Sequence, residues 1–106
     1  MFSLFQRSTQ NSISVAELDD ILGKIHLIDI REPYEYAYGS IKSAKNIPMG
    51  KLLAAPQKYL KQEEQYHIIC QSGGRSMSAV AALSKVGYDV INVKGGISSY
   101  RGKNRN

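Results

Sequence analysis

The sequence predicts a single α/β domain built on a parallel sheet with helices on both faces. Short apolar runs rich in β-branched residues alternate with helical patterns, which is typical of parallel strands buried on both faces. The chain has 106 residues without a repeat or a Pro/Gly/Ser-rich linker, so we expect one domain. Polar residues follow several of the apolar runs, at the sheet edge where ligands bind in such folds.

Local signals set the order of the elements. Ser14 with Glu17 three residues later has the capping-box spacing of a helix start. Pro33 suits a first helical position and Gly87 suits a helix end. The segment 75–86 carries few charges, so we expect a helix that is buried on most sides. We expect helices at 15–22, 33–38, 49–60 with a break near Pro56, 75–86 and a short one after 95–96, and strands at 26–30, 44–47, 66–70 and 89–93.

The composition excludes several classes of protein. Hydrophobic residues make up 42% and charged residues 22% of the chain, as in ordinary globular proteins. No apolar stretch reaches the roughly 18 residues of a membrane span, and residues 1–10 lack the features of a secretory signal. We therefore expect a cytoplasmic protein that does not contact membranes. The net charge of +5 comes mostly from scattered cations, which favours small anionic substrates rather than nucleic acid.

Cys70 is the single cysteine, which excludes an intramolecular disulfide and a multi-cysteine metal site. It is therefore either a buried filler or a reactive thiol. The segment 70–76 reads Cys-Gln-Ser-Gly-Gly-Arg-Ser and joins a strand to a helix, so backbone N–H groups should converge on an anion there. Gly73 and Gly74 permit positive φ and close approach of those amides. We expect a lowered pKa for Cys70 and a thiolate that needs no histidine base.

Other polar residues of the same edge support this hypothesis. The Arg75 guanidinium either binds a substrate oxyanion or holds the loop, and Ser72 and Ser76 add hydroxyl donors. Asp29 and Arg31 end another apolar strand. We expect the Asp29 carboxylate to bond neighbouring backbone rather than act as a base, because a thiolate held by amides needs none.

Four segments resemble, in order, the motifs of the rhodanese-like (sulfurtransferase) domain family, and the resemblance covers about residues 13–101. The segments are 27–36, 39–41 with 44–48, 70–76 and 93–96. The resemblance implies a three-layer fold with a five-stranded parallel sheet, a domain at 12–102 and loose termini at 1–11 and 103–106. It also implies that Cys70 carries sulfane sulfur as a persulfide held by the amides from Gln71 to Ser76, with Asp29 and Arg31 in a mainly structural role.

The sequence departs from the commoner family pattern in three places. Gln71 follows the cysteine where many thiosulfate-using members have arginine. Ser40 replaces a frequent histidine, and Ile97 and Tyr100 stand where tryptophans are often found. These differences leave the identity of the substrate undetermined, but they do not change the predicted fold.

The sequence therefore predicts a sulfurtransferase that moves sulfur from a donor such as thiosulfate to a thiol or cyanide through a Cys70 persulfide, without a cofactor or a metal. A persulfide-exchanging protein is a further candidate partner. The main alternative is a non-catalytic interaction or regulatory module of the same family. A phosphatase or arsenate reductase is less favoured, because four residues separate Cys70 from Arg75 where protein tyrosine phosphatases have one more.

Overall fold

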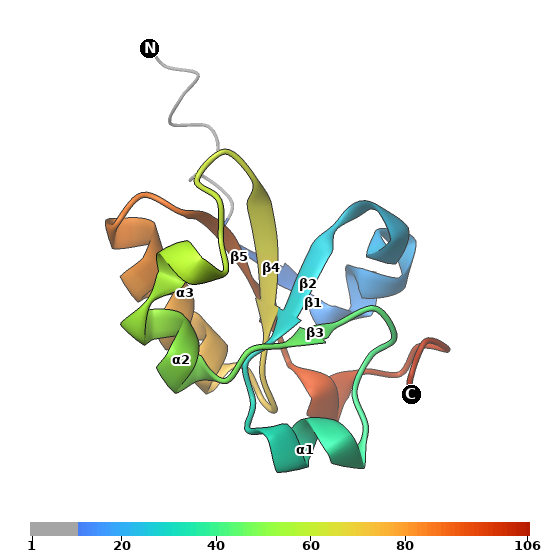
Figure 1. The fold of residues 1–106 in the computed structure, drawn as a ribbon. Coiled ribbons are helices and arrows are strands. Elements are labelled where there is room, and N and C mark those ends of the chain that lie inside the picture. The colour runs from blue at the N-terminus through green and yellow to red at the C-terminus, as the bar shows by residue number, and fades with distance from the viewer. Residues whose placement is uncertain (1–10) are drawn as a thin grey trace.

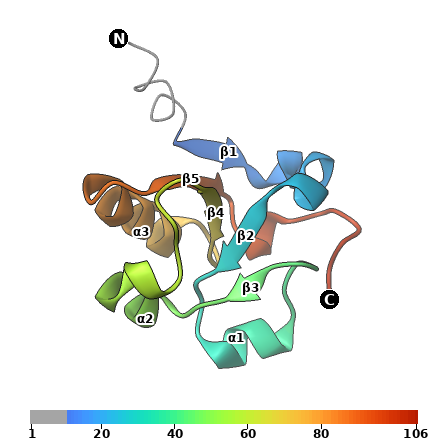
Figure 2. The same cartoon turned by 45° about the horizontal axis from the view of Figure 1, so that its top comes forward.

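A five-stranded sheet forms the centre of the computed structural model, which describes residues 11–106. All strand pairs are parallel, and the strand order is β1-β5-β4-β2-β3 (Figures 1 and 2). The strands are β1 Ser12–Ser14, β2 His26–Asp29, β3 Lys45–Asn46, β4 Gln65–Ile69 and β5 Asp89–Lys94. Because every connection returns to the same end of the sheet, the carboxyl ends of all five strands share one edge.

Helical segments cover both faces and the carboxyl edge of the sheet. The α-helices are α1 Pro33–Tyr38, α2 Met49–Ala54 and α3 Gly74–Lys85, and the 3₁₀ turns are η2 Val15–Asp20, η3 Leu22–Lys24, η4 Pro56–Lys58 and η5 Ile97–Ser99. Helices α2 and α3 lie on one face, the first 3₁₀ turns lie on the other, and α1 lies beyond the strand ends (Figure 1). Within residues 11–106, no helix is long and apolar enough to cross a membrane. This is the predicted three-layer α/β fold.

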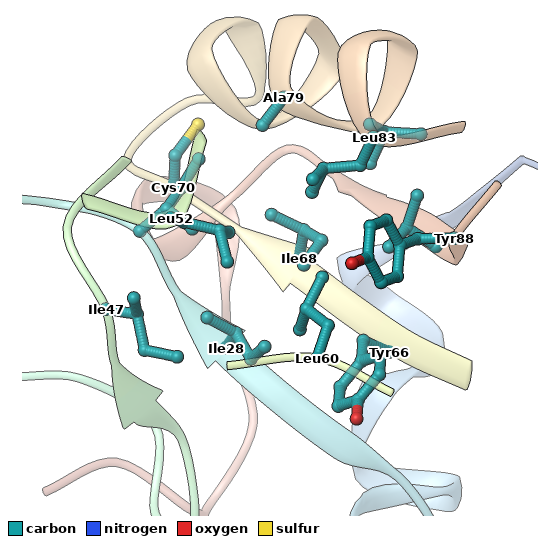
Figure 3. Packing of buried hydrophobic residues seen from close by; sticks show 13 residues of the cluster. Ile28, Ile47, Leu52, Leu60, Tyr66, Ile68, Cys70, Ala79, Leu83 and Tyr88 are labelled. Carbon is teal, nitrogen blue, oxygen red and sulfur yellow. The ribbon is translucent and has the colours of Figure 1, made fainter. Parts of the chain in front are cut away.

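Two apolar clusters hold these layers together, one on each face of the sheet. The cluster under α2 and α3 contains side chains from β2, β4 and β5 together with Leu52, Ala79 and Leu83 (Figure 3). The other cluster joins Leu27, Ile69 and Val93 of the sheet to the flanking 3₁₀ turns. Consecutive residues of the central strands therefore face different clusters. This is why β2 and β4 read as continuous apolar runs rather than as alternating ones.

The sequence locates the strands β2 to β5 to within about two residues but has no local signal for β1. Ser14 caps η2 as predicted, because its hydroxyl accepts from the Ala16 N–H and the Glu17 carboxylate accepts from the Ser14 N–H. The turn that follows is a 3₁₀ helix rather than an α-helix. Strand β1 is three residues long with a serine at each end, and its pairing of Ile13 with Val93 of β5 makes it a strand.

The prediction that the segment 75–86 is buried on most sides is wrong. Only one face of α3 is covered, through Ser76, Ala79, Val80 and Leu83. Met77 on the opposite side is 61% exposed. Alanine and serine fill much of the exposed face, so few charges there reflect small side chains rather than complete burial.

The carboxyl terminus is not loose, contrary to the expectation for residues 103–106. The Lys42 N–H donates to the Asn104 carbonyl (2.6 Å), and the Asn106 N–H donates to the Ser40 carbonyl (2.9 Å). Ile41 and Arg105 form an antiparallel bridge between these two contacts. The final residues therefore lie along the connection between α1 and β3. The matching expectation for residues 1–11 falls outside the described residues except at Asn11, whose carbonyl accepts from the Asn92 N–H.

The one-sided burial of α3 predicts unequal costs for two truncations on this helix. Leu83→Ala should lower the free energy of unfolding by about 2–5 kcal/mol, because it leaves a cavity in the core. Met77→Ala should change it by less than about 0.5 kcal/mol. Urea unfolding followed by far-UV circular dichroism measures both values, and equal losses would contradict the assignment of the two faces.

Candidate active site

Cys70 lies immediately beyond β4, at the carboxyl edge of the sheet. Its side chain is directed toward the start of α3 (Figure 3). The residue is 1% exposed and belongs to the apolar cluster beneath α2 and α3. Strand β4 therefore fixes the backbone of the cysteine, while the loop that enters α3 surrounds its sulfur.

Hydrogen-bond donors of the loop converge on this sulfur. The backbone N–H groups of Gly73 and Ser76 donate to Cys70 Sγ, over 3.1 and 3.3 Å. The thiol donates to Ser76 Oγ (3.3 Å), which in turn donates to the Gly73 carbonyl (3.1 Å). A thiolate has no proton to donate. On ionisation, the Ser76 hydroxyl can turn its proton from the carbonyl to the sulfur and become a third donor.

The balance of burial and hydrogen bonding lowers the pKa of Cys70. Burial of the thiol by itself raises this pKa, because it removes water from the anion. Hydrogen bonds from the Ser76 hydroxyl and from the backbone of Ser76, Gly73 and Ser72 outweigh that effect. The loop therefore stabilises the thiolate, the nucleophilic form of cysteine. No histidine is needed for this activation.

The two glycines of the loop differ in what the backbone demands of them. Gly73 has φ +111° and caps α3 in the left-handed region, as the sequence predicts. Gly74 begins the α-helix without a positive φ, and an added Cβ would meet nothing within 4 Å. The positive φ that the sequence permits at Gly74 is not used, because the chain has already turned at Gly73.

A second glycine pair, Gly95 and Gly96, lets the segment after β5 approach the cysteine loop closely. Gly96 has φ +64° and ψ −166°, a region essentially restricted to glycine. An added Cβ would come within 2.5 Å of the Gln71 carbonyl oxygen and 2.6 Å of that of Cys70. This close approach lets the Ile97 and Ser98 N–H groups donate to the same two carbonyls, each over 2.9 Å. The sequence shows the Gly-Gly pair but not that it contacts a segment more than twenty residues earlier.

A buried ion pair connects the end of β2 to the loop. The Arg31 guanidinium donates through Nε and Nη2 to both carboxylate oxygens of Asp29, over 2.9–3.1 Å. Its Nη1 donates to Gln71 Oε1 (3.0 Å) and its Nη2 also donates to the Gly39 carbonyl (2.7 Å). Asp29 is fully buried and Arg31 is 3% exposed. These two residues position the loop and do not touch the sulfur.

Arg75 is engaged by a carboxylate that the sequence analysis did not single out. Its Nη1 and Nη2 donate to the two oxygens of Glu35 over 2.9 and 3.0 Å. This bidentate bond is the main reason that the pKa of Glu35 falls to about 2. The sequence left two roles open for Arg75, binding of a substrate oxyanion and holding the loop. The structure shows the second, because Arg75 ties the loop to α1. Forty residues separate the partners, so no local sequence pattern predicts the pair.

Ser40 and Tyr100, which differ from the commoner family pattern, both form hydrogen bonds in the structure. The Ser40 hydroxyl is buried and donates to Asp29 Oδ2 (2.7 Å). The Tyr100 side chain packs in the second apolar cluster, and its hydroxyl donates to Asp19 Oδ1 (2.5 Å) while accepting from the Asn104 N–H (2.7 Å). Both residues complete hydrogen-bond networks that hold the carboxyl edge together. In the same part of the chain, residues 11–106, no cluster of three or more His, Cys, Asp and Glu side chains could hold a metal.

Comparison with known proteins agrees with this fold. The model of the rhodanese-like domain matches residues 14–103. The Bacillus subtilis protein YtwF is 37% identical over 84 residues, which cover 77% of this chain and 79% of that protein. A sulfurtransferase of Allochromatium vinosum is 37% identical over 87 residues, or 81% and 77% of the two chains. The crystal structure of a rhodanese-related protein from Thermoplasma volcanium has a TM-score of 0.77 and 38% identity, covering 85% and 89%.

The protein is therefore an α/β domain with an all-parallel, five-stranded sheet and a cysteine in an amide-lined loop beyond β4. The chain belongs to the rhodanese-like domain family.

The contact of Gly96 with the cysteine loop predicts a strong effect of adding one methyl group. Gly96→Ala should lower the free energy of unfolding by more than about 2 kcal/mol, because it combines strain and collision with backbone. Reaction of Cys70 with iodoacetamide at neutral pH should slow, since the loop amides would no longer face the sulfur. Gly23→Ala is the control, because its added Cβ meets nothing within 4 Å. Equal behaviour of the two variants would argue against the role assigned to Gly96.

The hydrogen bonds to the sulfur predict how the thiol titrates. The pKa of Cys70, read from thiolate absorbance at 240 nm, should lie below that of a free cysteine. Ser76→Ala should raise this pKa, because one donor to the thiolate is lost. Ser78→Ala removes an exposed hydroxyl from the same helix and should leave the titration unchanged. A Ser76→Ala midpoint equal to that of the wild type would show that its hydroxyl does not stabilise the thiolate.

Proposed function

We propose that this protein is a sulfurtransferase that carries sulfane sulfur as a persulfide on Cys70. The observation that supports this proposal most strongly is the pair of backbone N–H groups, from Gly73 and Ser76, that donate to Sγ. Donors fixed in the backbone stabilise a sulfur anion without reorganising during the reaction. The names of relatives such as the Allochromatium vinosum sulfurtransferase point to the same chemistry.

The reaction has two halves that pass through one covalent intermediate. The Cys70 thiolate attacks the outer sulfur of a donor such as thiosulfate and forms a new S–S bond. The donor's own S–S bond breaks, and its electron pair leaves with sulfite. A thiolate or cyanide then attacks the outer sulfur of the persulfide, and the Cys70 thiolate departs as the leaving group. Atoms and electrons balance without a cofactor or a metal.

Each residue near the sulfur has a separate part in this proposal. Cys70 is the nucleophile and the sulfur carrier. The loop from Gln71 to Ser76 binds the donor and holds the persulfide, with Gly73 and Ser76 supplying the amides directed at Sγ. Arg31 orients the Gln71 side chain and Asp29 orients Arg31.

The same chemistry supports a protein as donor or acceptor beside small molecules. The outer sulfur of a persulfide stands about 2.0 Å beyond Sγ, so it is the atom that an incoming nucleophile reaches. Burial of Sγ itself protects the cysteine from unwanted oxidation. A thiolate on another protein is therefore a chemically suitable acceptor, and the site requires neither a membrane nor nucleic acid.

The proposal predicts a sulfur-dependent mass change at one residue. Reduced protein treated with thiosulfate or with 2-mercaptoethanol persulfide should gain the mass of one sulfur atom, and cyanide should remove it while thiocyanate forms. Cys70→Ser should gain nothing while keeping its circular dichroism spectrum, because the hydroxyl is a poor nucleophile and cannot carry the sulfur. Intact-mass spectrometry measures the change. Failure of the wild type to gain sulfur from either donor would reject the proposal, as would an equal gain on Cys70→Ser.

A further inference from the structure

The two arginines at the cysteine loop, Arg31 and Arg75, are already paired. Arg31 is bound to the Asp29 carboxylate inside the domain, and both side chains are at most 4% exposed. Arg75 is bound to the Glu35 carboxylate through two hydrogen bonds. The residue directly after the cysteine is the neutral Gln71, whose side-chain oxygen accepts from Arg31. Each arginine at this loop therefore has a carboxylate partner of opposite charge.

Arg75 is the cation whose pairing matters most for a substrate. It lies in the first turn of α3 beside the cysteine loop, close enough to interact electrostatically with Cys70. Its side chain is 40% exposed whereas that of Glu35 is 20% exposed, so an incoming anion would meet the guanidinium together with the carboxylate that neutralises it. A nearby positive charge favours attack by a thiolate on a dianion, because it offsets the repulsion between the reactants. The bound Glu35 carboxylate weakens that effect of Arg75.

We propose that Glu35 is a specificity-determining residue, which neutralises Arg75 and thereby selects organic persulfides over thiosulfate as sulfur donors. This inference rests on the proposed function and specifies its donor. An organic persulfide, R–S–SH, has at most one negative charge on its two sulfurs, whereas thiosulfate has two. The loop amides suffice to hold a single sulfur anion. The pairing of Arg75 therefore lowers the rate of sulfur loading less for the persulfide than for thiosulfate.

The transfer from this donor is balanced. The Cys70 thiolate attacks the outer sulfur of R–S–SH, a new S–S bond forms, and the S–S bond of the donor breaks. The electron pair leaves with R–S⁻, and the outer sulfur keeps its proton or releases it to water. No oxidant or reductant takes part, since one thiolate and one S–S bond are present on each side.

The test is a comparison of two donors across charge variants. The values of kcat/KM for sulfur loading are measured by rapid-quench mass spectrometry with thiosulfate and with 2-mercaptoethanol persulfide, whose organic group is uncharged. We expect the wild type to prefer the persulfide by at least about tenfold, and Glu35→Gln to raise kcat/KM for thiosulfate by about tenfold while the persulfide value stays within about twofold. Glutamine keeps an oxygen that can accept the Glu32 N–H at the start of α1, so the substitution changes charge more than structure.

Two further variants show whether the gain comes from Arg75. Glu63→Gln makes the same charge change at an exposed site near the opposite end of β4 and should leave both donors unchanged. In the double variant Glu35→Gln with Arg75→Met, the gain with thiosulfate should disappear, because the unpaired guanidinium is gone. A gain that persists in the double variant would assign the effect to something other than Arg75.

The outcomes separate this inference from the proposed function. A wild type that loads from thiosulfate as fast as from the persulfide overturns the donor assignment, even if Glu35→Gln does not fold. An unchanged donor ratio in folded Glu35→Gln overturns the role of Glu35, while the persulfide mechanism stands. Absence of loading from both donors overturns the proposed function and this inference with it.

Discussion

The buried guanidinium of Arg31 is the interaction on which the carboxyl edge of the sheet depends. It contacts the Asp29 carboxylate, the Gly39 carbonyl after α1, and the Gln71 side chain in the cysteine loop. The end of β2, the end of α1 and the cysteine loop forty residues away thus meet on one planar group. A buried ion pair adds little net stability, because desolvation opposes attraction. Its value here is geometric, since five fixed N–H donors allow few relative positions of the segments that they join.

A second constraint acts from the other side of the loop. The start of η5 donates two N–H groups to the carbonyls of Cys70 and Gln71, and only glycine at position 96 allows so close an approach. With their carbonyls held in this way, the loop residues present N–H groups to Sγ. The lowered pKa of the cysteine follows from this orientation. Burial alone would raise the pKa, so the loop must supply enough hydrogen bonds to reverse the sign.

The pair formed by Arg75 and Glu35 connects architecture with chemistry. It ties α1 to the first turn of α3, and it also decides how much positive charge the site offers to an anion. A guanidinium at this position looks like a substrate-binding group when only the loop is considered. Its carboxylate partner gives the same residue a mainly structural contact and leaves recognition of sulfur to backbone amides. The contact between Arg75 and Glu35 therefore affects both the charge of the anion that the site favours and the position of the loop.

The sequence by itself determined the fold class, the order of most elements and the position of the reactive cysteine. Apolar runs such as 66–70, the Pro33 helix start and the glycine-rich turn are local features, and local features are encoded by neighbouring residues. Strand β1 escaped detection, because three residues without an apolar pattern become a strand only by pairing with β5. The ordered contacts of residues 103–106 likewise depend on the distant connection at Ser40 and Lys42.

Only the tertiary structure decided which groups surround the cysteine and which charges remain unpaired. Glu35 is an ordinary helical glutamate in the sequence, and its bond to Arg75 exists only because α1 packs beside the start of α3. Gly96 and Arg31 reach the loop because β5 and β2 pair with β4 on either side of it. Local patterns specify each element and the chemistry it carries, but a pairing between side chains forty residues apart depends on how the whole chain packs.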